Sequence, residues 1–356
     1  MYTITAAQEQ ILLREAKAGS TRYQGWGTNK DEVTKIFAGA SSANDWYREC
    51  NVLARGHEEH GDGVVAEERR MVSYLTAAAF YHMGELLMLP DNEEKKAAFN
   101  SFESVYQKAA AFFPFPAEPV EVPFDGGTLP GYYRRVQGIP KAPSVILVRG
   151  VDACREVELH IISNHFLKHG LFTLSVDLPG QGKARMRGRK MTPDFEKPVA
   201  AVVDYLAGKP EIDGRRIGIL GMSFGGFIAP RAACLEKRLK ACVSLGGFFG
   251  LDEFEFPLGA KLNCFNNMRF STEEEWQRGR KDYSLESCIG KLTWPLLVVN
   301  GSDDKVIPAS QSVKMHDRAP GPKALRIFEG LGHCVYYERP QVLTEIALWM
   351  KEQLAA

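Results

Sequence analysis

Gly221-Met222-Ser223-Phe224-Gly225-Gly226 is the stretch of this sequence that points most clearly to a fold. It follows the apolar run 217–220, which is typical of a buried strand, and precedes the run 227–234, which reads as the start of a helix. A glycine-flanked serine between a strand and a helix forms a nucleophile elbow. The serine then occupies a strained turn, and side chains at Gly221 or Gly225 would clash with the neighbouring strand and helix.

The chain around this stretch alternates between strands and helices. We expect a β-hairpin over 120–136, buried strands at 145–148, 171–176, 241–245, 296–300 and 324–328, and a final helix at 342–354. This alternation predicts an α/β fold with a mostly parallel, doubly wound sheet. We place the catalytic domain at 118–356, and residues 248–291, which interrupt the alternation, are expected to form a lid over the site.

Residues 1–117 carry almost no strand signal. Helical spacing of apolar residues predicts helices at 6–18, 44–60 and 64–89, and another that starts at the capping residues 91–94. The sequence therefore predicts a helical N-terminal domain over 1–117, which would serve as a cap or substrate domain.

A serine hydroxyl is a weak nucleophile and needs a base that an acid orients. In this fold the three residues follow the chain order serine, acid, histidine. Asp303 and Asp304 both follow the strand at 296–300, and the pattern Gly-x-x-Asp-x-x-(Val/Ile)-Pro favours Asp304 as the acid. His333 follows the final strand in the stretch Gly330-Leu331-Gly332-His333, whose glycines we expect to let its loop approach Ser223.

Such a serine also needs two N–H donors for the oxyanion of the tetrahedral intermediate. One should be the N–H of Phe224, which follows the nucleophile. The other should come from the loop after the strand at 145–148, where Gly150 allows close approach and Val151 N–H is the candidate. Arg149 and Asp152 in that loop could act directly or pair locally as structural residues.

Four other residues are possible substrate-binding groups, and each has a structural alternative. Glu253 could place a carboxylate over the pocket from the lid, or form a salt bridge within it. Trp46, Tyr81 and His82 could line a substrate cavity, although helix packing is the usual role of such residues. His57 and His60 lack a third ligand, and the cysteines lack a C-x-x-C pair, so we predict no metal and no cofactor.

The composition excludes several classes of partner. Lys+Arg 44 balance Asp+Glu 44 among 356 residues, which argues against nucleic acid or an acidic membrane surface as the partner.

The start of the chain shows no signal peptide, and the most apolar helical stretch is too short to span a bilayer. Most of the seven scattered cysteines are expected to be buried in a reducing, cytoplasmic environment.

The layout resembles one branch of the α/β-hydrolases, the group that contains 2,6-dihydroxypseudooxynicotine hydrolase and the fungal polyketide-shortening hydrolases. The resemblance is carried by the helical segment, the Asp-Leu-Pro-Gly-Gln-Gly stretch at 177–182, the serine motif, and Tyr283-Ser284-Leu285 before the acid strand. It implies cleavage of a C–C bond next to a ketone in an aromatic or polyketide-like small molecule, a pocket between the helices and the core, and a homodimer. It also implies an accessory glutamate, for which Glu253 is the nearest match.

We therefore expect a serine hydrolase that cleaves a carbonyl compound through Ser223, His333 and Asp304. An esterase, lactonase or transacylase of secondary metabolism is the enzymatic alternative, because the pocket and not the triad selects the leaving group. A ligand-binding protein on the same fold is the alternative from another class.

Overall fold

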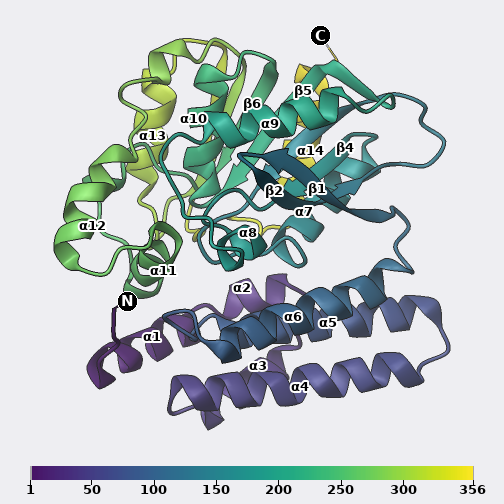
Figure 1. The fold of residues 1–356 in the computed structure, drawn as a ribbon, viewed down its shortest axis with the longest axis vertical. Helices are drawn as coiled ribbons and strands as arrows, with labels where there is room; N and C mark the ends of the chain where they lie inside the picture. The colour runs from purple at the N-terminus through teal and green to yellow at the C-terminus, as the bar shows by residue number, and fades with distance from the viewer. Residues whose placement is uncertain (1, 356) are drawn as a thin grey trace.

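A computed structural model describes residues 2–355 of the chain and shows an eight-stranded sheet (Figure 1). The strand order is β1-β2-β4-β3-β5-β6-β7-β8. Strands β1 and β2 form the predicted hairpin, β2 pairs with β4 in antiparallel orientation, and the remaining pairs are parallel. The bounds are β1 Ala117–Phe124, β2 Gly127–Arg134, β3 Ala142–Val148, β4 Phe172–Val176, β5 Ile212–Met222, β6 Leu239–Leu245, β7 Leu296–Gly301 and β8 Lys323–Phe328. The predicted α/β fold is confirmed.

Helices cover both faces of this sheet, as its apolar strands require. One face packs against α9 (Glu196–Ala207), α10 (Gly225–Leu235) and α13 (Ala309–Arg318). The other face packs against α7 (Glu158–Lys168) and α14 (Gln341–Gln353). Alternate residues of β3 point to opposite faces, so Ile146 belongs to the first core and Leu147 to the second.

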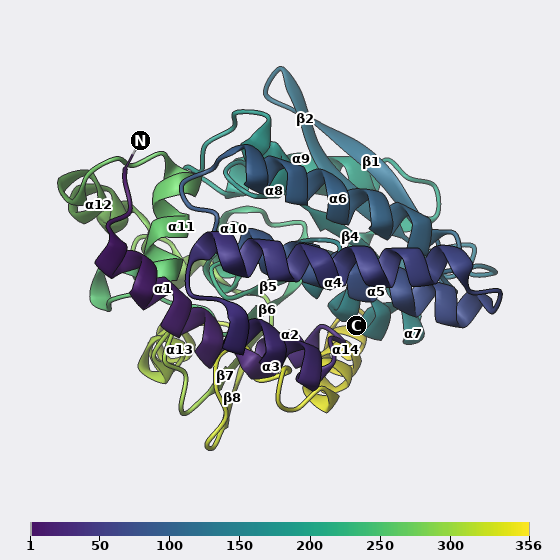
Figure 2. The same ribbon diagram turned by 90° about the horizontal axis from the view of Figure 1, so that it is seen from below.

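The N-terminal helices form a separate layer that lies across one end of the sheet (Figures 1 and 2). They are α1 Ala6–Ala18, α2 Ser20–Gly25, α3 Lys30–Gly39, α4 Ala43–Gly63, α5 Glu67–Glu85 and α6 Glu93–Ala110. Their apolar faces bury one another around Trp46 and Phe80. The change from helices to strands falls between Ala110 and Ala117, and the division into two domains stays a prediction.

The segment between β6 and β7 contains two helices, α11 (Leu258–Met268) and α12 (Glu273–Gly279). Three short 3₁₀ helices accompany them: η1 Leu251–Glu253, η2 Arg280–Asp282 and η3 Ile289–Lys291. Helix α11 contacts α1, and the Glu15 carboxylate accepts hydrogen bonds from the N–H groups of Leu258 and Gly259 at 2.9 and 2.8 Å. A glutamate of the first helix therefore caps the N-terminus of α11.

None of the helices within residues 2–355 combines the length and the apolar character that a membrane span requires.

Candidate active site

The turn between β5 and α10 has the geometry of a nucleophile elbow. Ser223 adopts a φ of +55°, a strained conformation for a residue with a side chain. A Cβ atom on Gly221 would lie 1.8 Å from the carbonyl oxygen of Gly225. A Cβ atom on Gly225 would lie 2.4 Å from the carbonyl oxygen of Val148 in β3. Both glycines are therefore required by backbone contacts, as the sequence predicted.

Three side chains from separate loops meet at this turn. His333 Nε2 lies 2.9 Å from Ser223 Oγ, and His333 Nδ1 lies 2.7 Å from Asp304 Oδ2. The other carboxylate oxygen of Asp304 accepts hydrogen bonds from the N–H groups of Val306 and Ile307, both at 2.8 Å. The serine, histidine and aspartate predicted from the sequence thus form one hydrogen-bonded chain.

The choice between the two neighbouring aspartates follows from their positions. Asp304 is buried against His333, whereas the Asp303 side chain is 57% exposed and pairs with Lys305. Burial opposes the charge on the His333 imidazole, but the Asp304 carboxylate outweighs that cost and raises the pKa of His333 well above its usual value. Asp304 is therefore the residue that orients the imidazole and favours its protonation.

The loop that carries His333 approaches the sheet through glycines at the strand ends. A Cβ atom on Gly301, at the end of β7, would lie 2.0 Å from the carbonyl oxygen of Leu331. A Cβ atom on Gly246 would lie 3.3 Å from His333 Cε1, whereas one on Gly332 would meet only the Glu338 side chain at 3.0 Å. Gly330 adopts a φ of +70°, a conformation that favours glycine, so the loop depends on this predicted glycine as well as on Gly301 and Gly246.

The loop after β3 passes directly beside the nucleophile. A Cβ atom on Gly150 would lie 2.9 Å from the Cβ of Ser223, so only glycine allows this approach. Neither the Phe224 N–H nor the Val151 N–H has a hydrogen-bond partner within the described residues. Both groups are available to a bound oxyanion, and their assignment as its donors stays a prediction.

Two charged residues of this loop pair over long range and not locally. Arg149 is buried and lies 3.5 Å from Asp177, which follows β4. Asp152 accepts a hydrogen bond at 2.8 Å from Arg22 of helix α2, 130 residues away in the sequence. The expectation of local pairing is therefore wrong, because the N-terminal helices supply the partner of Asp152.

A cavity of about 470 Å³ opens onto Ser223 and His333. Its walls come from α1 and α2, from the residues just after α5, from the start of α11, from the end of β5, and from the loops after β3, β7 and β8. Helix α2 contributes Arg22 and Tyr23, α1 contributes Leu12 and Glu15, and the insertion contributes Phe256 and Asn263. None of these six residues could be predicted from the sequence, since helical spacing shows that a face is buried without showing what covers it.

The four possible substrate-binding residues lie outside this cavity. Trp46 is fully buried and donates its indole N–H to the Met83 carbonyl at 2.8 Å, so it packs helices. Tyr81 donates to Glu58 at 3.2 Å. Glu253 pairs at 2.6 Å with Lys314 of α13, so the salt bridge expected within the lid is instead one from the insertion to a helix of the catalytic part.

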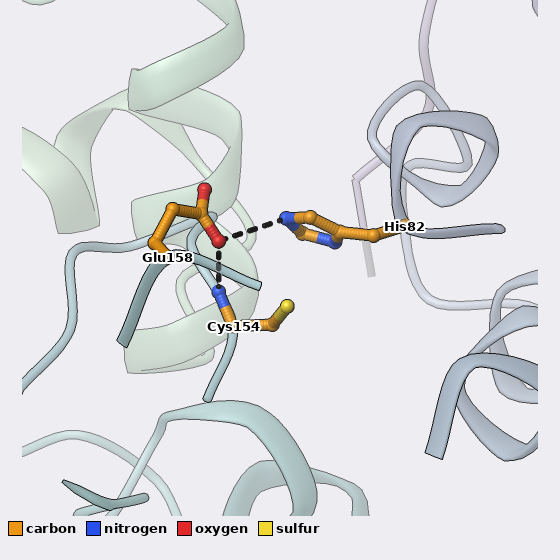
Figure 3. A group of neighbouring side chains, drawn as sticks. All are labelled: His82, Cys154 and Glu158. Atoms are coloured by element: carbon orange, nitrogen blue, oxygen red, sulfur yellow. Dashed lines mark hydrogen bonds and ion pairs between the residues drawn. The ribbon is translucent and has the colours of Figure 1, made fainter. Parts of the chain in front are cut away.

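The fourth of these residues, His82, belongs to a buried group with Cys154 and Glu158 (Figure 3). Their possible ligand atoms lie within 4.8 Å of one another, and no other such group occurs among the described residues. Burial raises the pKa of the Cys154 thiol to about 11. His82 instead forms ion pairs with Glu85 at 2.9 Å and Glu158 at 3.5 Å. These ion pairs give His82 and Glu158 a structural role, and the absence of a metal stays a prediction. All seven cysteines are free and buried, as predicted.

Comparison with known proteins places this geometry in a family. The esterase FrsA-like family matches residues 28–251, and the prolyl oligopeptidase family matches residues 183–356. The 2,6-dihydropseudooxynicotine hydrolase of Paenarthrobacter nicotinovorans is 29% identical over 87% of this chain and 85% of its own length. Hydrolase ORFZ of Pyricularia oryzae is 32% identical over 81% of this chain and 72% of its own length.

A solved structure agrees with these sequence matches. The crystal structure of 2,6-dihydroxy-pseudo-oxynicotine hydrolase superposes with a TM-score of 0.83 at 27% identity, over 94% of this chain and 95% of that chain. The predicted resemblance is confirmed, and the reading as a ligand-binding protein gives way to that of an enzyme. Since the FrsA-like match spans more than half of its length, the chain belongs to the esterase FrsA-like family of α/β-hydrolases.

Proposed function

We propose that this chain is a serine hydrolase with Ser223 as nucleophile, His333 as general base and Asp304 as the acid that orients the imidazole. The proposal rests on one observation, the unbroken hydrogen-bonded chain from Asp304 through His333 to Ser223 at the mouth of a cavity. The Phe224 and Val151 N–H groups are proposed as the oxyanion donors.

The reaction follows from these positions. His333 Nε2 takes the proton of Ser223 Oγ as the oxygen attacks the substrate carbonyl carbon. Negative charge develops on the carbonyl oxygen, and the two N–H groups stabilise it. The intermediate then collapses to an acyl-enzyme, and the imidazolium returns its proton to the leaving group. Water, activated by His333, releases the acid product and restores Ser223.

We propose a C–C bond next to a ketone as the bond that is cleaved, in an aromatic or polyketide-like substrate. A carbanion can leave only if a neighbouring carbonyl or phenol delocalises its charge, so the substrate must supply that group. The cavity volume of about 470 Å³ lies in the range of small-molecule sites. The name of the relative 2,6-dihydropseudooxynicotine hydrolase, which matches over 87% of this chain, supports a substrate with an aromatic ring.

Ester cleavage is a second candidate, favoured by the match to the esterase FrsA-like family. An ester requires only protonation of the alkoxide, so the same triad would serve, and lactone hydrolysis or acyl transfer would follow the same course. The leaving group depends on the cavity walls and not on Ser223.

A fluorophosphonate probe tests the shared part of both candidates. We expect the probe to label the wild-type chain, to leave Ser223→Ala unlabelled, and to label the control Ser101→Ala on helix α6 as it labels the wild type. Absence of labelling of the wild type across the pH range would contradict the proposal. Product analysis with β-diketones and with esters of similar shape then separates C–C cleavage from ester cleavage.

Two further predictions from the sequence remain proposals. We propose that residues 1–117 and 118–356 are distinct domains, which limited proteolysis tests by cleavage near residue 115. We also propose a homodimer, which light scattering coupled to gel filtration tests through the mass in solution.

A further inference from the structure

Side chains from outside the loop hold the proposed oxyanion loop, residues 149–152, in place. Gln181 Nε2 donates to the carbonyl oxygen of Arg149 at 2.7 Å. Asn267 of helix α11 is 1% exposed, and its Nδ2 donates to the carbonyl oxygen of Val151 at 3.0 Å. The backbone of the residue assigned as the second oxyanion donor is thus fixed by a side chain of the insertion.

Helix α2 holds the same loop from the other side. Arg22 Nη1 donates to Asp152 Oδ2 at 2.8 Å, and its Nη2 reaches the Asp152 carbonyl oxygen at 3.4 Å. The guanidinium therefore holds both the side chain and the backbone of the residue next to Val151. A planar guanidinium with several donors suits this double contact, which a lysine could make only in part.

The guanidinium is itself fixed by a buried row of charges. Arg22 Nη2 lies 3.0 Å from Glu158, which faces His82 at 3.5 Å, and His82 pairs with Glu85, which pairs with Lys95 at 2.6 Å. Burial favours the protonated form of Glu158, but His82 and Arg22 outweigh it and lower its pKa to about 2. Through these ion pairs, helices α5 and α6 are connected to Arg22 and so to the loop at 149–152.

These pairings decide between two roles for Arg22. Arg22 lines the cavity, and a free arginine there would bind an anionic group of the substrate. Its single positive charge, however, already faces the two carboxylates of Asp152 and Glu158. The surroundings are therefore not cationic, and the side chain is committed to the protein.

We propose that Arg22 of α2 and Asn267 of α11 are positioning residues for the oxyanion hole, which hold the Val151 N–H in the place where it meets the developing charge. The inference rests on the proposed function, because it assumes that Val151 is an oxyanion donor. It means that the hole is complete only when the helical layer and the insertion are both seated on the loop after β3.

The test compares Arg22→Met with a matched control. Arg185 of helix α8 (Gly182–Met186) pairs with Asp91 at 2.7 Å and also joins the helical layer to the catalytic part, but it does not hold the loop at 149–152. For Arg22→Met, Arg22→Lys, Asn267→Leu, Arg185→Met and Ser223→Ala, kcat and KM are measured with p-nitrophenyl acetate. The rate of Ser223 phosphonylation by a fluorophosphonate, which also builds charge in the hole, is measured in parallel.

We expect Arg22→Met to lower kcat and the phosphonylation rate together by about 10- to 100-fold, since a displacement of about 1 Å in an active site can cost about 100-fold. KM should change little, Asn267→Leu should act in the same direction, Arg22→Lys should recover part of the loss, and Arg185→Met should retain its kcat. If Arg22→Met fails to fold, the kcat and the phosphonylation rate of Asn267→Leu test the inference in its place.

Two outcomes overturn the inference while Ser223→Ala is inactive and the proposed function stands. One is a kcat for Arg22→Met, or for Asn267→Leu, that is no lower than that of Arg185→Met. The other is a rise in KM at constant kcat, which would make Arg22 a substrate-binding residue. Full turnover by Ser223→Ala would instead remove the proposed function, and the inference with it.

Discussion

Replacing Asp304 by asparagine tests the proposed triad through the proton position on His333. The two N–H donors of Val306 and Ile307, both at 2.8 Å, point at Asp304 Oδ1, so the asparagine must place its amide oxygen there. Its NH₂ group then faces His333 Nδ1, in the position of the oxygen that lies at 2.7 Å in the wild type. The imidazole must carry its proton on Nε2, directed at Ser223, and can no longer accept one.

The expected loss of kcat in Asp304→Asn follows because His333 can no longer act as a base, although the side chains keep their positions. In a triad, the wrong tautomer costs about 10⁴-fold in kcat. At about 1.36 kcal/mol for each factor of ten, this is about 5.4 kcal/mol of activation free energy. The free energy of unfolding should fall by only about 2 kcal/mol, because the backbone hydrogen bonds persist with a neutral acceptor in place of a charged one.

The assay measures kcat with p-nitrophenyl acetate, the labelling rate with a fluorophosphonate, and thermal unfolding. Asp303→Asn is the matched control: Asp303 also lines the cavity, but its side chain pairs with Lys305 and not with His333, so the variant should keep the proton position on His333 and a kcat close to that of the wild type. A variant Asp304→Asn that keeps most of the wild-type kcat would refute the tautomer argument. Equal losses in the two variants would show that the loop, and not the proton position, controls the rate.

The geometry of the site makes two further predictions. Burial of His333 opposes its protonation, and the Asp304 carboxylate favours it. The net effect raises the pKa of His333, so the neutral imidazole forms at pH values above the usual histidine pKa of about 6.5. We therefore expect kcat/KM to increase with pH through a pKa above that value, and a limb centred below it in a pH–rate profile would contradict this reasoning. In Gly221→Ala the new Cβ would lie 1.8 Å from a backbone oxygen of α10, so calorimetry should show destabilisation of about 3 kcal/mol or more, whereas Gly290→Ala, with open space around it, should leave stability unchanged.

The members of the proposed triad could be located from the sequence because each follows directly on a strand. Ser223 begins the turn after β5, Asp304 follows β7 and His333 follows β8. Parallel strands end at one edge of their sheet, so chain order and strand assignment place all three side chains together. The glycines of the elbow added a second constraint, which the close approach of backbone atoms at Gly221 explains.

The cavity walls could not be inferred in the same way. Trp46 and Tyr81 have the residue types of a binding site, but they face the core between α4, α5 and their neighbours. Helix α2 has only six residues and no apolar period, so nothing in its sequence marks Arg22 as a residue of the cavity. Its contact with Asp152 joins positions 130 residues apart, and such a pairing depends on how the helical layer sits on the sheet.

The walls of the cavity and the oxyanion loop are connected through shared side chains. Glu15 of α1 caps α11, Asn267 of α11 holds the carbonyl of Val151, and Arg22 of α2 holds Asp152. A movement of α1 or α11 that admits substrate would therefore break contacts that fix the loop beside Ser223. A buried carboxylate that loses its cationic partner raises the free energy of the protein. These charges therefore favour the arrangement in the structure, with the helices seated on the loop after β3. The helical layer thus does more than cover the site, since the geometry of the reacting centre depends on its being in place.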